Sequence, residues 1–129
     1  MKFLLDSNAV IALLKGHAGF LTRLREYRPQ DFGLPAIVMH ELFYGAYKGQ
    51  RREENVARLE ALQFEVLDFD REDARQAGEL RALLAAAGTP IGACDVLIAG
   101  QALARDLILV THNMREFQRV AGLRIEDWK

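Results

Sequence analysis

The chain has 129 residues, the size of one ordinary globular domain, so we expect a single domain over residues 1–129. Half of its residues are apolar and 27% are charged, a balance that excludes a disordered or fibrous protein. The formal net charge of -1 excludes a protein that coats nucleic acid without specificity, so any nucleic-acid contact must be local. A single cysteine, Cys94, excludes an internal disulfide and a cysteine-based zinc site, as fits a reducing cytosol.

The apolar stretch at residues 1–14 superficially resembles a secretion signal. Asp6, Ser7 and Asn8 divide it into two runs that are too short for a signal peptide or a membrane span. We therefore expect a cytoplasmic protein that begins at Met1 and has no membrane contact.

Hydrophobic periodicity predicts an alternation of strands and helices. In the first half of the chain the pattern predicts a strand at 2–5, helices at 9–15 and 18–28, a strand at 31–34 that Pro35 terminates, and helices at 36–47 and 50–62. In the second half it predicts a strand at 64–69, a helix through residue 87 that Asp70 caps, and a helix at 92–105. A strand at 107–110, a short helix at 114–119 and a strand at 123–125 complete the pattern. This order implies an α/β fold with a mostly parallel central sheet of four to five strands and helices on both faces.

Polar residues follow the two most apolar strands directly. Strand 2–5 ends at Asp6-Ser7-Asn8, and strand 107–110 ends at Thr111-His112-Asn113. Ligands of parallel sheets bind beyond the carboxyl ends of the strands, where the strand order reverses. We expect any functional site at this edge.

Two acidic residues in the first half of the chain are candidates for that site. Asp6 is either a cap of the next helix or a functional carboxylate, and spacing alone leaves both readings open. Helical spacing places Glu41 on the same face as Val38 and Tyr44, and we expect this face to be turned inward. A buried glutamate needs a cation, a metal or the solvent of a cleft, and we favour function over a salt bridge.

Two more acidic residues lie in the second half. Asp95 shares a helix face with Ile98, Ala99 and Ala102, and we expect it to point toward the sheet, although a helix N-cap is an equal alternative. Glu116 lies three residues after Asn113, the spacing of a capping box, which by itself indicates a structural role.

Carboxylates that converge at the end of a sheet repel each other unless a divalent cation neutralises them. Hard oxygen ligands favour Mg²⁺, with Mn²⁺ as a substitute. The chemistry that follows is metal-assisted hydrolysis of a phosphodiester.

Other chemistries lack their residues. His40-Glu41 begins like a zinc-protease helix, but Tyr44 occupies the position of the second histidine. No nucleophile elbow or phosphate-binding loop is present in the sequence, Cys94 is interpreted as a core residue, and His112, like His17, is interpreted as a surface residue.

The ordered set of these motifs resembles that of a PIN-domain ribonuclease, specifically a VapC toxin, over the whole chain. The motifs are Asp6-Ser7-Asn8, Glu41, Ile91-Gly92-x-x-Asp95-x-x-Ile98-Ala99, Thr111-His112-Asn113-x-x-Glu116-Phe117 and the ending Arg119 to Trp128. The resemblance implies that Asp6, Glu41 and Asp95 hold the metal. Where many members carry Asp, this chain has Asn113, so Glu116 is the implied fourth acid, and Asn113 and Thr111 are implied to orient ligands or water.

The resemblance further implies an Mg²⁺-dependent endoribonuclease that inhibits translation and that forms a homodimer. It also implies a VapB-type antitoxin that blocks the site and carries the pair onto operator DNA. The ending of the chain resembles that of toxins that cut tRNA, and the implied substrate is the anticodon loop of initiator tRNA.

Two groups of residues in the sequence are candidate contacts for such partners. One group is a set of basic residues that could contact RNA or could equally form a solvated helix face: Lys15, Arg23, Arg25, Arg28, Lys48, Arg51 and Arg52. Tyr44 and Tyr47, with Phe43, are either core residues or a contact for the antitoxin or a second copy.

Two alternative functions remain open from the residues themselves. An aspartyl-phosphate protein also places aspartates at strand ends, but the second aspartate of the phosphatase motif and the lysine of a receiver are missing here. A catalytically silent binding module that keeps the fold is the other alternative, and three intact acids argue against it.

Overall fold

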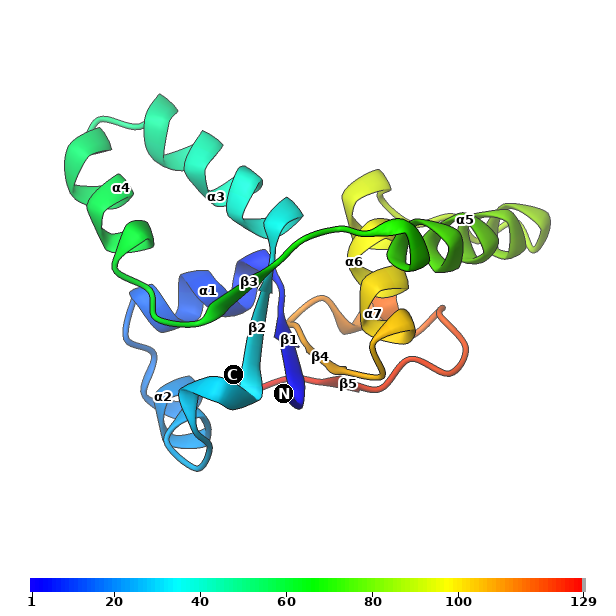
Figure 1. Cartoon of the computed structure of the whole chain (residues 1–129), viewed down its shortest axis with the longest axis horizontal. Coiled ribbons are helices and arrows are strands. Elements are labelled where there is room, and N and C mark those ends of the chain that lie inside the picture. The colour runs from blue at the N-terminus through cyan, green and yellow to red at the C-terminus, as the bar shows by residue number, and fades with distance from the viewer. Residues whose placement is uncertain (129) are drawn as a thin grey trace.

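The computed structural model describes residues 1–128, and within them one parallel sheet has the strand order β3-β2-β1-β4-β5 (Figure 1). The strands are β1 (Phe3–Leu5), β2 (Phe32–Pro35), β3 (Glu65–Leu67), β4 (Ile108–Val110) and β5 (Ile125–Glu126). The predicted α/β fold with a parallel sheet is confirmed. Because the chain winds outward from β1 in both directions, the strand order reverses between β1 and β4, the position where such sheets bind ligands.

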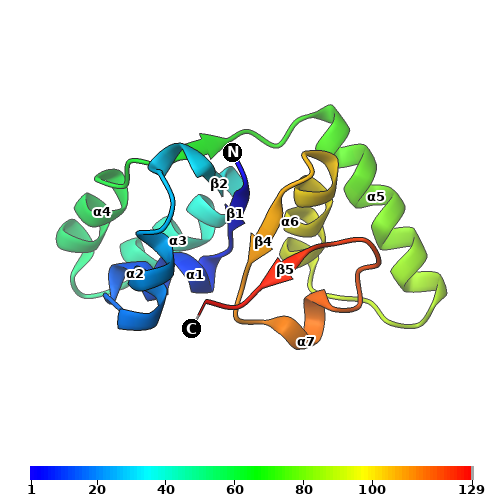
Figure 2. The ribbon, with the colours of Figure 1, turned by 90° about the horizontal axis from the view of Figure 1, so that it is seen from below.

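Seven α-helices flank the sheet within residues 1–128. They are α1 (Ser7–Leu14), α2 (Ala18–Leu24), α3 (Ala36–Lys48), α4 (Arg52–Glu60), α5 (Arg71–Ala86), α6 (Ala93–Ala104) and α7 (Met114–Phe117). Two views show α1 to α4 on one side of the sheet and α5 to α7 on the other (Figures 1 and 2). Within residues 1–128 no helix is both long and apolar enough to cross a bilayer.

The core lies between these helix layers and the sheet. Phe3, Leu4 and Leu5 of β1 are all buried, as expected for a central strand that is covered on both faces. The ring of Trp128 packs 4.9 Å from that of Phe3 and 5.6 Å from that of Phe20, centroid to centroid. These contacts anchor the end of the described chain beside β1 and α2.

Local boundaries differ from the prediction around residues 25–35. The predicted helix 18–28 ends at Leu24, and Asp31 lies in a 3-10 helix, η1 (Pro29–Asp31), where its carboxylate accepts the backbone N–H of Arg28 at 3.0 Å. Pro35 is the last residue of β2 and does not stop the strand before itself. Asp70 caps α5 as predicted, because its carboxylate accepts the N–H of Asp73 at 3.0 Å.

Candidate active site at the carboxyl ends of β1 and β4

Asp6 follows β1 directly and is only 5% exposed. Its Oδ1 accepts the N–H of Ala9 at 2.9 Å, so the predicted cap of α1 is present. Thr111, the first residue after β4, hydrogen-bonds to the same carboxylate. Burial raises the pKa of Asp6, although the hydrogen bonds from Thr111 and Ala9 oppose that rise. A carboxylate can cap a helix while it is exposed to solvent, so the capping role does not explain why the carboxylate of Asp6 is buried.

Glu41 extends from α3 toward the same edge and is partly exposed. The Oγ of Ser7, at the start of α1, donates to its Oε1 at 3.3 Å. The prediction that this helix face is turned inward holds for Val38, which is buried, but it is wrong for Tyr44, which is 62% exposed. Buried Val38 and Met39 precede Glu41 on α3 and exposed Tyr44 follows it, so Glu41 lies at the border between core and solvent.

Asp95 is the third residue of α6. The N-cap of this helix is Gly92, so the alternative that Asp95 is the N-cap is wrong, whereas Ile98 and Ala99 are buried on its face as predicted. Burial, then a hydrogen bond with the Glu116 carboxyl group and the negative charge around it, raise the pKa of Asp95 to about 7. Asp95 therefore keeps its proton to a much higher pH than an exposed aspartate does.

Glu116 in α7 bridges to the start of α6. One carboxylate oxygen accepts the backbone N–H of Gly92, and the other accepts Nδ2 of Asn113 at 2.8 Å. The hydrogen bond from Gly92 is the main cause of the lowered pKa of Glu116. The capping box indicated by the spacing does not form, because the N–H of Asn113 donates to Oγ1 of Thr111 at 2.9 Å and is no longer free to bind Glu116.

Gly92 leaves these two carboxyl groups open. A Cβ atom at this position would lie 3.4 Å from Oδ2 of Asp95 and 3.5 Å from Oε1 of Glu116. A larger side chain would cover both groups. Gly92 belongs to the motif Ile91-Gly92-x-x-Asp95, but only the folded geometry shows that its missing side chain leaves Asp95 and Glu116 accessible.

The four carboxylates, Asp6, Glu41, Asp95 and Glu116, form what we call the acidic site. Within residues 1–128 none of them forms an ion pair with a lysine or arginine. The charges of Glu116, Asp6 and Glu41 each raise the pKa of Asp95, which shows that the four groups share one electrostatic environment.

The donor set fits a hard divalent cation, because it consists of carboxylate, amide and hydroxyl oxygens and carries uncompensated negative charge. As the side chains stand, no three histidine, cysteine, aspartate or glutamate residues among residues 1–128 are gathered closely enough to ligate one ion.

Three other sequence interpretations have an outcome here. Cys94, interpreted as a core residue, is exposed on the first turn of α6. Tyr44 and Tyr47 are 62% and 53% exposed, so neither belongs to the core. Thr111 and Asn113 hydrogen-bond to members of the acidic site, a placement that is compatible with an orienting role.

Known proteins resemble this chain in sequence and in fold. Residues 3–123 match the family model of the PIN domain. The chain is 41% identical over 130 residues to the tRNA(fMet)-specific endonuclease VapC of Salmonella typhimurium, covering 99% of this chain and 98% of the relative. It is 35% identical to Ribonuclease VapC2 of Haemophilus influenzae over the same shares of both chains.

A solved structure agrees with these relatives. The crystal structure of DNA-bound VapBC from Salmonella typhimurium superposes with a TM-score of 0.94 at 39% identity, covering 100% of this chain and 99% of that one. The chain therefore belongs to the VapC-type ribonucleases of the PIN-domain family. PIN-domain ribonucleases in general depend on metal ions, and the family assignment removes the aspartyl-phosphate alternative.

Proposed function

We propose that this protein is the toxin of a toxin-antitoxin pair, a metal-dependent endoribonuclease that cleaves RNA in the cytoplasm and stops translation. The observation that carries the proposal is the uncompensated acidic site at the switch point of the sheet. The 41% identity to an endonuclease named for tRNA(fMet) supports this activity and makes initiator tRNA, cut in its anticodon loop, the first substrate to test.

The metal that best suits the acidic site is Mg²⁺, with Mn²⁺ as a substitute. Asp6, Glu41, Asp95 and Glu116 would hold it. A bound divalent ion would supply an activated water and neutralise charge on the phosphodiester.

The surrounding residues fix the positions of these acids. Thr111 orients Asp6, Ser7 orients Glu41 and Asn113 orients Glu116, each through a hydrogen bond. Gly92 leaves room for substrate beside Asp95.

The partner proposed for the apolar side of the site is a VapB-type antitoxin. A groove of about 370 Å³ runs between α1, α3 and α4, with Leu14, Leu42 and Leu59 in its walls and Glu41 within its lining. Tyr44 and Tyr47 extend the apolar surface on the same helix. An arginine of the antitoxin could reach Glu41 and take the place of the metal's charge. The structural relative contains VapBC bound to DNA, which supports operator DNA as a partner of the complex.

A homodimer is also proposed, and α5 offers a surface for it. Leu83 of α5 is 63% exposed, and a neighbouring pocket is lined by Leu84 and Ile91. Sedimentation equilibrium of the chain alone should give twice the monomer mass, and Leu83→Glu should reduce it to that of the monomer.

The decisive experiment for the activity is induction of the protein alone in cells, with sequencing of the resulting RNA ends. Growth arrest together with one cleaved position in initiator tRNA is the expected result. Co-expression of the antitoxin should restore growth. Unimpaired growth with a well-folded protein and intact RNA would move the assignment to the silent binding module.

A further inference from the structure

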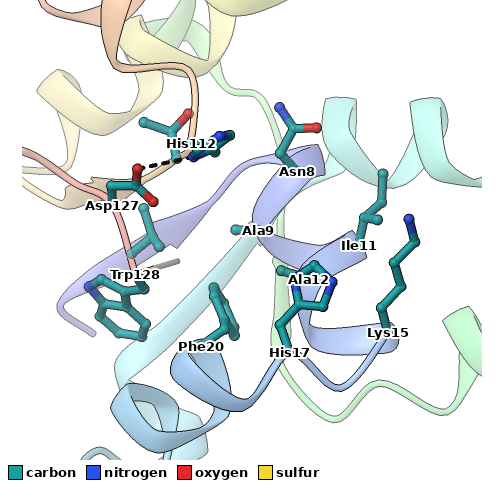
Figure 3. A pocket seen from close by; sticks show the side chains of 12 residues that line it. Asn8, Ala9, Ile11, Ala12, Lys15, His17, Phe20, His112, Asp127 and Trp128 are labelled. Atoms are coloured by element: carbon teal, nitrogen blue, oxygen red, sulfur yellow. Dashed lines mark hydrogen bonds and ion pairs between the residues drawn. The ribbon is translucent and has the colours of Figure 1, made fainter.

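A second pocket lies on the other side of α1 from the antitoxin groove (Figure 3). It has a volume of about 230 Å³. Small and aromatic side chains form its apolar part, including Ala9, Phe20 and Trp128, which are 4%, 2% and 3% exposed. The packing of Trp128 against the core holds this wall in place.

Polar side chains form the rim of this pocket. Nδ1 of His112 lies 3.0 Å from Oδ2 of Asp127, which fixes the orientation of the imidazole ring. Figure 3 shows His112 between Asp127 and Asn8, with Lys15 further along α1. Asp127 is the single carboxylate among the lining residues, whereas His17, His112 and Lys15 can all carry positive charge. The sequence interpretation of His112 as an ordinary surface residue misses this arrangement.

The pocket is directly connected to the acidic site. Asn8 lies two residues after Asp6 in the first turn of α1, and His112 follows Thr111, which hydrogen-bonds to Asp6. Both rim residues thus come from the two strand ends that supply Asp6 and Thr111, and Thr111 also lines the pocket. A ligand in the pocket would therefore lie near a phosphodiester bound at the acidic site.

We propose that this pocket receives one unpaired nucleobase of the RNA, adjacent to the bond that is cut. The inference rests on the proposed ribonuclease function and adds to it a determinant of where the strand is cleaved. Its volume lies below the roughly 300–1,000 Å³ of pockets that hold a drug-sized ligand, so it suits one ring system.

The chemistry of the lining matches a base. The apolar floor of the pocket, in which Phe20 and Trp128 are almost fully buried, gives a splayed-out base a surface to pack on, and imidazole, amide and carboxylate groups can hydrogen-bond to its edge. Lys15, exposed beyond the rim, is placed to contact a backbone phosphate of the same strand. A protein segment is a poorer occupant, because the neighbouring groove with Leu14, Leu42 and Leu59 is the larger apolar surface.

Two variants alter the pocket without changing the acidic site. His112→Ala removes the edge contact, and Ala12→Leu fills the pocket from α1 with a residue that favours helix. The matched controls are His40→Ala on α3 and Ala82→Leu on α5, both exposed positions outside the pocket. Thermal melts of each variant establish that it is folded.

The activity test uses synthetic RNAs that contain the mapped cut site, with an abasic nucleotide introduced at one position at a time. With the wild type, one position next to the cut should lower kcat/KM on the order of tenfold. His112→Ala and Ala12→Leu should lower kcat/KM on intact RNA by a similar factor, and the abasic nucleotide should then cost them little more, as expected for two changes to one contact. The controls should behave like the wild type.

A binding test needs no catalysis. Trp128 is the only tryptophan of the chain and lines the pocket. In an Asp6→Asn background with EDTA, the intact RNA should quench its fluorescence, and the abasic RNA or the Ala12→Leu variant should not show this quenching.

The failure of this inference differs from the failure of the proposed function. A wild-type protein that cleaves no RNA contradicts the ribonuclease assignment. A wild-type protein that cleaves RNA, with His112→Ala and Ala12→Leu equal to it in kcat/KM, overturns the nucleobase pocket alone. Loss of antitoxin binding in these variants with unchanged cleavage also overturns it and assigns the pocket to the antitoxin.

Discussion

Carboxyl groups near the two ends of α6 are in opposite electrostatic states. At its carboxyl end, Asp73 of α5 is 1% exposed and bonds to Nη2 of Arg105 at 2.9 Å and to Nε2 of Gln101 at 3.0 Å. Burial alone would raise the pKa of Asp73, but the hydrogen bonds from Arg105, Asp70 and Gln101 lower it below the ordinary value. At the amino end, Asp95 has no such cation and its pKa rises to about 7.

This difference separates a structural carboxylate from a functional one. A buried charge is costly unless it is paired, and the fold satisfies that requirement at Asp73. At the acidic site no carboxylate forms an ion pair with a lysine or arginine among residues 1–128, and shifted groups of this kind mark functional sites.

The largest expected effect is on catalysis. Asp6→Asn should lower Mg²⁺-dependent RNA cleavage by more than about 100-fold and abolish growth arrest, because it removes a proposed metal ligand. Asparagine caps a helix as well as aspartate does, so the melting temperature should stay close to that of the wild type. The measurement is cleavage of a labelled RNA together with growth after induction.

The matched control for Asp6→Asn is Asp70→Asn, the same change at the cap of α5. It should leave cleavage near the wild-type rate. Full activity of Asp6→Asn, in an assay where EDTA stops the wild type, would contradict the assignment of the metal site.

The next effect is on stability at the other end of α6. Asp73→Ala should lower the free energy of unfolding by about 3 kcal/mol, because it removes the buried carboxylate that accepts from Arg105 and Gln101. Urea unfolding at neutral pH measures it. Under conditions in which the variant is folded, its cleavage rate should match that of the wild type. A loss of cleavage in the folded variant would show that the Asp73 end of α6 also contributes to catalysis.

The third prediction concerns pH. Here the substitution should raise the stability of the protein, whereas Asp73→Ala should lower it. The folded chain holds a proton on Asp95 up to about pH 7, whereas the unfolded chain releases it near the ordinary value of 3.8. Between these values the folded state binds more protons, so the free energy of unfolding contributed by Asp95 falls as pH rises. Asp95→Asn removes this pH-dependent loss of stability, because asparagine does not ionise. Its amide N–H can donate to Glu116 as the protonated acid does.

In EDTA, Asp95→Asn should therefore melt above the wild type at pH 8 and close to it at pH 4, while its RNA cleavage is lost. Thermal melts across this range measure the difference. Glu72→Gln, a change to an exposed acid of α5 whose pKa is lowered by Arg75, is the control and should not stabilise the protein at pH 8. A melting temperature of Asp95→Asn below the wild type at pH 8 would mean that Asp95 is structural.

The sequence predicts the centre of the sheet well because the two central strands, β1 and β4, are largely buried and end at polar residues. Phe3–Leu5 and Ile108–Val110 are such strands, and the switch point between them follows from their order. Propensity could not indicate η1, since it depends on the contact between Asp31 and Arg28 within a tight turn.

The acidic site is only partly readable in the sequence. Asp6 and Asp95 follow from motif and family resemblance. The capping box that the spacing of Glu116 predicts does not form, because its carboxylate accepts Nδ2 of Asn113 and the N–H of Gly92, which lies 24 residues away along the chain. The pocket at His112 was missed for the same reason, since Asp127 and Asn8 meet it only in the folded sheet.

The smallest expected effect tests this long-range role of Glu116. Glu116→Gln keeps one acceptor oxygen but replaces the other with an NH₂ group, so one of the bonds from Gly92 and Asn113 is lost. The free energy of unfolding should fall by about 1 kcal/mol. Cleavage should also fall, and a higher Mg²⁺ concentration should restore part of it, because a weakened metal site can be saturated.

The control that separates the two roles is Asn113→Ala. This change removes the Nδ2 donor to Glu116 and leaves the Glu116 charge and the bond from Gly92 in place. If Glu116 contributes charge to the metal site, Asn113→Ala should require less additional Mg²⁺ for recovery than Glu116→Gln does. Equal cleavage by Glu116→Gln and the wild type at low Mg²⁺, with only the stability lowered, would show that Glu116 joins α7 to α6 and does not hold the ion.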